Sequence, residues 1–200
     1  MSLTVIDGYD VIDGYDALAD FMDDRFDTWS RKLWASDREA FADLFDAMHT
    51  PLLRYAARLT TEEAAYDVVQ EAFVSLWRMR ASLDPDRSLK SLLYTLVRNE
   101  ALNQRRAMRR RQDRHAEYSP SRQPSPSDEV DSDALRTRMR AWIDDLPERQ
   151  REAFRLSRFD DLTHDEIADV MDIAPRTVTN HVTKALQTLR DRLDDHRSTN

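Results

Sequence analysis

The chain has 200 residues, enough for one or two small domains, and it contains no cysteine, which excludes disulfide bonds and thiolate chemistry. Its only glycines are Gly8 and Gly14, so the rest of the chain has no glycine-rich phosphate loop of the Walker or Rossmann kind. No apolar run approaches the roughly 20 residues that span a bilayer, and the first residues do not resemble a signal peptide. We therefore expect a cytoplasmic protein without membrane insertion.

The formal net charge of −8 is distributed unevenly along the chain. Residues 1–30 carry eight Asp and one Arg, whereas residues 31–110 carry fourteen Arg or Lys and eleven Asp or Glu. Because binding to nucleic acid depends on the local patch of charge, the overall acidity does not exclude a DNA partner. The basic side chains gather in one run, at Arg98, Arg105, Arg106, Arg109, Arg110, Arg111 and Arg114.

Residues 1–30 contain a direct repeat, in which Val-Ile-Asp-Gly-Tyr-Asp occurs at 5–10 and again at 11–16. Two copies of six residues are too few for a repeat fold. The acidic composition is typical of disordered segments, so we expect an acidic N-terminal extension that is disordered. The alternative hypothesis is an acidic arm that covers a basic DNA-binding face.

Residues 31–114 show the spacing of apolar side chains that is typical of packed helices, and they form the first predicted domain. Ser36 and Glu39 have the spacing of a cap for its first helix. A second helix is expected over residues 61–80, and a third begins after a turn, from about Ser88.

The expected helix at 61–80 has two unlike faces. Thr60 and Glu63 stand at its start with the spacing of a capping box. Its apolar side chains recur at intervals of three and four, which places them on one stripe. That stripe holds Val68, Val69, Ala72, Phe73, Leu76 and Trp77. The opposite face carries Asp67, Gln70, Glu71 and Val74.

Residues 115–135 are rich in Ser, Pro and Asp, and their three prolines predict an extended linker. A second helical domain is expected over residues 136–195. The sequence therefore predicts an all-α protein in which two small helical domains are joined by a flexible linker and do not pack on each other.

Within the second domain, residues 163–190 have the pattern of a helix-turn-helix. Thr163 and Glu166 cap a short helix, Asp172 stands at a sharp turn, and Pro175 takes the first position of the next helix, where its missing N–H costs nothing. Polar side chains at the start of that second helix point outward and can donate to phosphates and base edges in a major groove. They are Arg176, Thr177, Thr179, Asn180, His181 and Lys184.

The order of residues adds a resemblance to these patterns. Asp-Val-Val-Gln-Glu-Ala-Phe at 67–73 resembles region 2.2 of the sigma-70 family of bacterial RNA polymerase sigma factors. Residues 88–99 and their arginine-rich continuation resemble regions 2.3 and 2.4, and residues 163–190 resemble region 4.2. A region 2, a linker in place of region 3, and a region 4 form the layout of the extracytoplasmic-function (ECF) group of that family.

The resemblance implies a function for each surface. Asp67, Gln70, Glu71 and Val74 would bind the clamp of core RNA polymerase. The −10 promoter element would be recognised and melted by Tyr94, Arg98, Asn99, Arg105, Arg106, Arg109 and Arg110. The −35 element would be read by Arg176, Thr177, Thr179, Asn180, His181 and Lys184. An anti-sigma factor is a further candidate partner, because many relatives are held inactive by one.

Three other interpretations are weaker. A LuxR-type regulator would suit residues 177–182, but it needs a receiver or ligand domain, and residues 31–114 are helical and free of glycine. A polymerase-binding adaptor would share the helix at 61–80 without needing the arginines. An enzyme, cofactor or metal site is not expected, because no histidine pair has His-x-x-x-His spacing, and consecutive residues such as those at 164–166 point in different directions on a helix.

Overall fold

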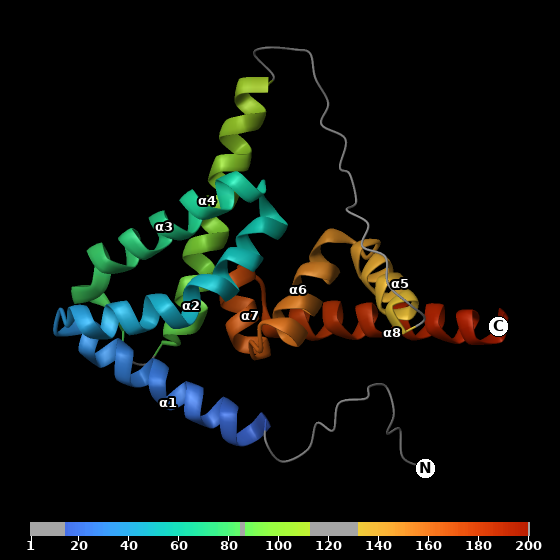
Figure 1. The fold of residues 1–200 in the computed structure, drawn as a ribbon, viewed down its shortest axis with the longest axis horizontal. Coiled ribbons are helices and arrows are strands. Elements are labelled where there is room, and N and C mark those ends of the chain that lie inside the picture. The colour runs from blue at the N-terminus through green and yellow to red at the C-terminus, as the bar shows by residue number, and fades with distance from the viewer. Residues whose placement is uncertain (1–14, 85–86, 113–131, 200) are drawn as a thin grey trace.

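The computed structural model describes residues 15–84, 87–112 and 132–199 of the chain (Figure 1). Within these ranges the protein consists of α-helices and one 3-10 turn, without a strand, which confirms the predicted all-α class. The elements are α1 (Tyr15–Trp34), α2 (Arg38–Leu59), α3 (Glu62–Met79), η1 (Arg80–Ser82), α4 (Leu89–Gln112), α5 (Ser132–Asp144), α6 (Glu148–Phe159), α7 (His164–Met171) and α8 (Pro175–Thr199).

Helix α1 was not expected, because the sequence predicts a disordered extension over residues 1–30. Phe26, Trp29 and Leu33 recur at intervals of three and four, and all three side chains are buried where α1 packs on α2 and α4. Phe26 and Trp29 meet edge to face, with ring centroids 5.3 Å apart. This segment has many aspartates but also a short apolar stripe, and the stripe packs α1 against the rest of the domain. The duplicated residues 1–14 lie outside the described ranges.

The caps of two helices in the first domain lie one residue later than predicted. Asp37 caps α2, since its carboxylate accepts hydrogen bonds from the backbone N–H groups of Glu39 and Ala40. Thr61, whose hydroxyl accepts from the N–H of Ala64, caps α3, whereas Thr60 terminates α2. In each case two adjacent residues can cap a helix, and the spacing of Glu three residues later favours the wrong one of the two.

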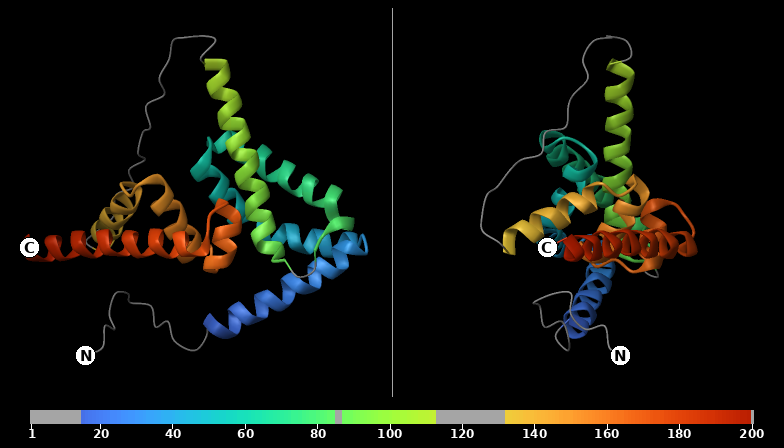
Figure 2. Two further views of the ribbon diagram at one scale, coloured as in Figure 1. Left: turned by 180° about the vertical axis from the view of Figure 1, so that it is seen from behind. Right: turned by 90° about the vertical axis from the view of Figure 1, so that its right-hand side faces the viewer.

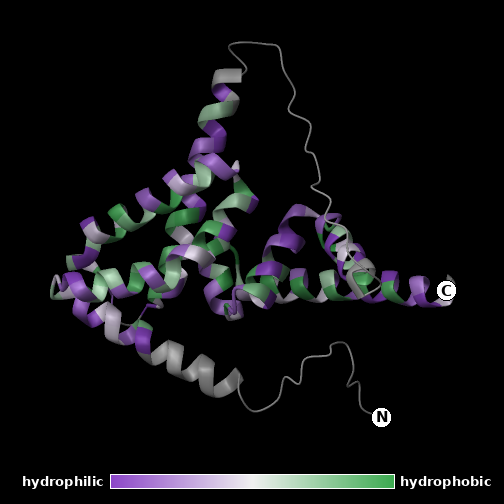
Figure 3. Cartoon of the chain, in the orientation of Figure 1, coloured by the Kyte–Doolittle hydropathy of each residue, from purple (hydrophilic) through white to green (hydrophobic). Residues whose placement is uncertain are grey.

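Helices α2, α3 and α4 form the core of the first domain. The predicted stripe of α3 is buried between α2 and α4, with Val68, Val69 and Leu76 fully enclosed. Helix α4 is longer than the bundle, and its C-terminal part projects beyond the other helices (Figures 1 and 2). The projecting part is mostly hydrophilic, as expected for the arginine-rich end of a helix (Figure 3).

Helices α5 to α8 form the second domain. The long helix α8 packs against α5, α6 and α7, and its buried stripe includes Val178, Val182, Ala185 and Leu189. Of the predicted linker, the described residues 132–135 already belong to α5, and residues 113–131 lie outside the described ranges.

The two domains pack directly on each other, whereas the sequence predicted domains separated by the linker. Helix α7 lies against α4, and one continuous apolar core contains Leu93 of α4 together with Ile167 and Met171 of α7 (Figure 2). This docking decides which of the predicted functional residues are exposed.

Candidate polymerase and promoter interfaces

The four residues predicted to bind polymerase lie together on the exposed face of α3. Gln70 and Val74 line an apolar groove of about 570 Å³ between α2 and α3, and Val74 is 40% exposed. Asp67 and Glu71 are exposed on the same helix, and Glu71 accepts a hydrogen bond from Arg78 at 3.3 Å. The sequence-predicted face is therefore a groove with acidic side chains beside it.

Aromatic side chains form the walls of this groove, which we call the aromatic groove. Phe41 packs against Phe73 and Trp77 with centroid distances of 5.9 Å and 5.0 Å, and Phe45 lies 4.8 Å from Phe73. The guanidinium of Arg80 covers the Trp77 ring at 4.3 Å. Phe41 and Phe45 were not among the residues predicted to bind polymerase. Both rings are half-buried, and they reach the groove only because α2 packs against α3 in the folded domain.

The residues predicted for the −10 element divide into two sets along α4. Asn99, Arg106 and Arg110 lie on its exposed side. Tyr94 is only 1% exposed, so its ring is not available as the open stacking surface that the sequence predicted. The ring lies 5.2 Å from that of Tyr55. Arg98 and Arg105 are directed toward the second domain, and the side chain of Arg109 is outside the described structure.

Asp160, at the end of α6, is the centre of the first polar contact between the domains. Its carboxylate accepts hydrogen bonds from Arg58 at 2.9 Å and from the Tyr94 hydroxyl at 3.3 Å, and its side chain is 1% exposed. Burial raises the pKa of Asp160, although the charge of Arg58 opposes this. Burial, together with the charge of Asp160, also raises the pKa of Tyr94.

Glu152, one turn after the start of α6, makes the second contact. One oxygen accepts from the Tyr55 hydroxyl at 3.0 Å and from Nε of Arg98 at 2.8 Å, and the Arg98 and Glu152 side chains are 11% and 10% exposed. Burial lowers the pKa of Arg98, but the hydrogen bond and charge of Glu152 outweigh it, and the pKa is raised overall. Burial and Glu152 also raise the pKa of Tyr55.

The helix-turn-helix is formed as the sequence predicted. The hydroxyl of Thr163 accepts from the N–H of Glu166, and the Glu166 carboxylate accepts from the N–H of Thr163 at 2.8 Å, which completes the capping box. Asp172 ends α7 in the left-handed conformation, with φ of 53°. Pro175 is the first residue of α8.

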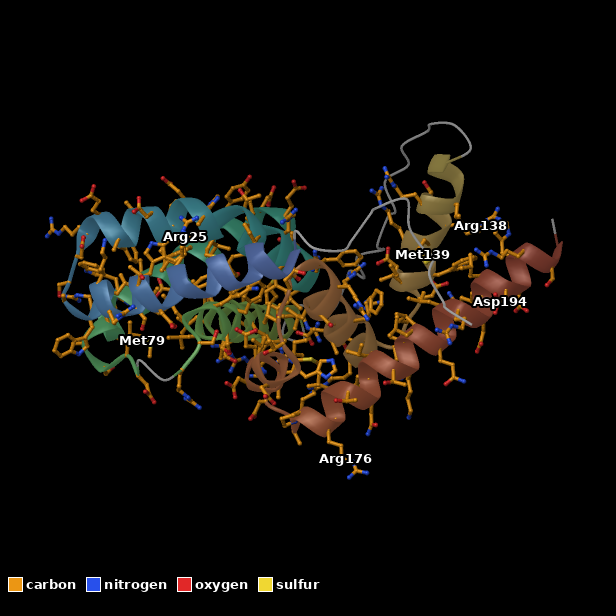
Figure 4. The ribbon with its side chains drawn as sticks, turned by 90° about the horizontal axis from the view of Figure 1, so that it is seen from below. Arg25, Met79, Arg138, Met139, Arg176 and Asp194 are labelled. Atoms are coloured by element: carbon orange, nitrogen blue, oxygen red, sulfur yellow. The ribbon has the colours of Figure 1, made fainter. Side chains whose placement is uncertain are left out.

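The residues predicted for the −35 element lie on the first turns of α8. Arg176, Asn180 and Lys184 are exposed, and Figure 4 shows Arg176 pointing away from the body of the molecule. Thr179 is exposed but engaged, since its hydroxyl lies 3.1 Å from Nδ1 of His164 and donates to the Pro175 carbonyl. The remaining two, Thr177 and His181, are half-buried.

Comparison with known proteins agrees with this geometry. Residues 44–112 match the family model for sigma-70 region 2, and residues 136–189 match that for sigma-70, region 4. The ECF RNA polymerase sigma factor SigK of Mycolicibacterium vanbaalenii is 27% identical over 170 residues, which are 82% of this chain and 87% of SigK. The chain belongs to the sigma-70 family, in its ECF group. It is a sigma factor, a subunit that directs transcription initiation at promoters.

Two solved structures share the sigma-factor fold. The structure of CnrH in complex with the cytosolic domain of CnrY has a TM-score of 0.60 and 20% identity, covering 86% of this chain and 98% of that one. The sigma factor RpoE in complex with the anti-sigma factor NepR, from Bartonella quintana, has a TM-score of 0.61 and 24% identity, covering 77% and 96%. Both likenesses extend over more than three quarters of this chain and show a shared fold.

Two kinds of site have no candidate in the part of this sigma factor that the structure describes. Its His, Asp and Glu side chains form no group of three or more that could hold a metal ion. None of the described helices is long and apolar enough to cross a bilayer.

Proposed function

We propose that region 2 binds core polymerase through the aromatic groove and melts the −10 element with α4, while α8 of region 4 reads the −35 element. One observation carries the proposal: a single chain presents an open apolar groove on α3 and a complete helix-turn-helix with outward donors on α8. A LuxR-type regulator needs no such groove, and an adaptor needs no recognition helix.

The aromatic groove supports the polymerase contact. Apolar side chains of a partner helix can be buried against Phe41, Phe45 and Trp77, which supplies affinity without a large rearrangement of rigid rings. Asp67 and Glu71 lie beside the groove and would select a partner with basic side chains by steering its approach. We assign Gln70 and Val74 to the groove itself.

For the −10 element, the exposed side of α4 supplies the first contacts. Arg106 and Arg110 neutralise phosphates, and Asn99 offers a bidentate amide to an extruded base. A melted strand also needs charge and stacking along the rest of the helix. Arg98, Arg105 and Tyr94 can contribute only after α6 has moved away from α4.

For the −35 element, α8 would enter the major groove with its N-terminal turns. Arg176 and Lys184 suit phosphates or guanine edges, and Asn180 suits adenine. Each domain alone would bind promoter DNA weakly, and the linker between them raises the effective concentration of the second domain once the first is bound.

We further infer a cytoplasmic protein without catalytic activity of its own, since sigma factors are specificity subunits. An anti-sigma factor is a fitting partner, because a solved relative of the same fold is a sigma factor held in complex with one.

The test is run-off transcription with bacterial core polymerase, the purified protein and a library of genomic promoter fragments. Discrete transcripts that depend on the protein would support the proposal, and their start sites would locate both promoter elements. The Val74→Asp variant should lose transcripts and polymerase binding together, since it places a charge in the aromatic groove. Binding to core polymerase without any transcript would instead favour the adaptor.

A further inference from the structure

Four side chains of α4 that face region 4 lie on one stripe of the helix. Lys90, Tyr94, Arg98 and Arg105 are spaced by four, four and seven residues, which keeps them within about a quarter of the helix circumference. Each one ends on a group of region 4. We call this stripe the covered face of α4.

The partners of the covered face are acidic or carbonyl oxygens from α6 and the turn that follows it. Lys90 donates to the backbone carbonyl of Asp161 at 2.6 Å, and Tyr94 donates to the carboxylate of Asp160. Arg98 pairs with Glu152 at 2.8 Å, and Arg105 pairs with Glu148 at 3.1 Å. Just before α4, the Ser88 hydroxyl donates to Glu166 at 2.6 Å. The contact thus follows α4 for four turns.

The polar contacts between α4 and region 4 differ in burial, and the buried ones contribute more to the docking of the domains than the exposed one. Arg105 and Glu148 are 39% and 66% exposed, and a pair so exposed to solvent contributes little. The Arg98–Glu152 pair and the Asp160 carboxylate are almost fully enclosed, where a charge without a partner is costly. No buried polar side-chain atom among the described residues lacks a hydrogen-bond partner. Such complete satisfaction indicates a specific docking surface.

We propose that α6 is an internal competitor for promoter DNA: its carboxylates occupy the covered face of α4 in place of DNA phosphates and keep the free sigma factor in an inactive, closed arrangement. The inference rests on the proposed role of α4 at the −10 element. It assigns Glu152 and Asp160 a regulatory function, which is to hold Arg98 and Tyr94 until region 4 is displaced.

The closed arrangement leaves the other two interfaces open. The aromatic groove shares no residue with the contact between α4 and α6, and Val74 is exposed within it. Arg176 and Asn180 on α8 are also exposed. Polymerase can therefore engage the groove first, and the −10 strand gains its full contacts only when region 4 moves toward its own DNA site.

The absence of cysteine from the chain allows a direct test. Thr50→Cys on α2 and Gln187→Cys on α8 are exposed positions that can carry a fluorescent pair to report the distance between the domains. The test variant is Glu152→Gln with Asp160→Asn, which removes two charges and retains the shapes. The matched control is Glu62→Gln with Glu63→Gln, which removes two exposed charges of α3.

The free protein, labelled in this way, is titrated with a single-stranded oligonucleotide of the −10 non-template sequence found by run-off transcription. We expect the test variant to show a longer distance between domains and at least tenfold tighter binding than wild type, while the control resembles wild type in both. The single variant Glu152→Gln should change both readouts in the same direction by less. It keeps the test valid if Asp160→Asn unfolds region 4, which circular dichroism would detect.

An unchanged distance in the test variant would overturn the claim that these carboxylates hold the domains together. A longer distance with unchanged affinity, or equal tightening in the control, would overturn the competition with DNA. Failure of the proposed function is a separate result, because wild-type protein would then bind core polymerase but yield no promoter-specific transcript.

Discussion

Helices α4 and α8 are the two elements assigned to DNA, and they differ in how far their donor side chains are exposed. The donor residues of α8, such as Arg176 and Asn180, lie in the open. On α4, Asn99 and Arg106 are exposed, whereas Arg98 is paired within a buried contact. In the free protein the donor residues of α8 are exposed, whereas part of α4 is covered by region 4, the domain that contains α8.

This difference has a physical cause in the composition of the two helices. The donors of α8 stand on the face opposite its buried stripe, so packing against α6 and α7 leaves them outside. Helix α4 has apolar residues on one face and a long row of cations on another, and the acidic residues of α6 are complementary to that row. A basic helix can satisfy its charges with carboxylates of its own chain as well as with phosphates.

The largest effect is expected from removing the carboxylate at the centre of the domain contact. Asp160→Ala leaves Arg58 without its ion-pair partner and the Tyr94 hydroxyl without an acceptor. We expect a loss of about 3 kcal/mol in the free energy of unfolding, because a partly buried cation loses its counter-charge and the buried Tyr94 hydroxyl loses its acceptor. Urea unfolding followed by circular dichroism measures this. Asp165→Ala, at an exposed position of α7, is the control, and an equal loss in both would mean that the domain contact is not special.

The sequence predicted the helices around both DNA sites, but it did not predict this contact. Periodicity located α3, the start of α4 and both helices of the helix-turn-helix, because each has an apolar stripe and a start marked by a capping side chain or by Pro175. The Arg98–Glu152 pair joins residues 54 positions apart, so no local pattern records it. Tyr94 was assigned to DNA for its chemistry, but its ring is buried beside Tyr55 and its hydroxyl donates to Asp160, 66 positions away.

Helix α1 and the walls of the aromatic groove were missed for related reasons. The stripe of Phe26, Trp29 and Leu33 is short and lies beside many aspartates, so composition outweighed periodicity. Phe41 matches the inward spacing of α2, and only the packing of α3 across from it shows that its ring also forms a surface. Long-range packing, rather than local propensity, accounts for each of these differences.

The next effect concerns the cations of α4 that remain near the surface. Arg105→Ala with Arg106→Ala should weaken promoter opening by about 2 kcal/mol, since two phosphate contacts are lost, while binding to core polymerase is unchanged. Permanganate reactivity of promoter thymines reports opening, and a pull-down reports polymerase binding. A parallel fall in both measurements would contradict the assignment of these arginines to DNA.

A smaller effect distinguishes α4 from α8 by whether the binding free-energy changes of two substitutions add. Arg98→Ala removes a DNA contact but also releases Glu152, so its cost for −10 strand binding should be partly cancelled in wild type and fully visible in a Glu152→Gln background. The coupling energy expected is about 1 kcal/mol. Arg176→Ala, on the open helix α8, should add independently to Glu152→Gln when binding to −35 duplex is measured. Coupling of Arg176 to Glu152 would remove the distinction between an open and a covered helix.

The smallest effect is expected from pH, through the hydroxyl of Tyr94. Burial and the neighbouring Asp160 raise the pKa of Tyr94 above its usual value near 10, so the closed arrangement favours the protonated phenol. Its contribution is fully present below about pH 10 and is lost as the pH rises further, while Arg98 remains charged because its pKa is raised. The distance between domains should therefore be constant from about pH 7 to 9 and increase above about pH 10. Tyr94→Phe should weaken docking by about 1 kcal/mol and reduce this high-pH response. An equal high-pH opening in Tyr94→Phe would assign the response to another group, with Tyr55 the first to examine because its buried hydroxyl faces Glu152.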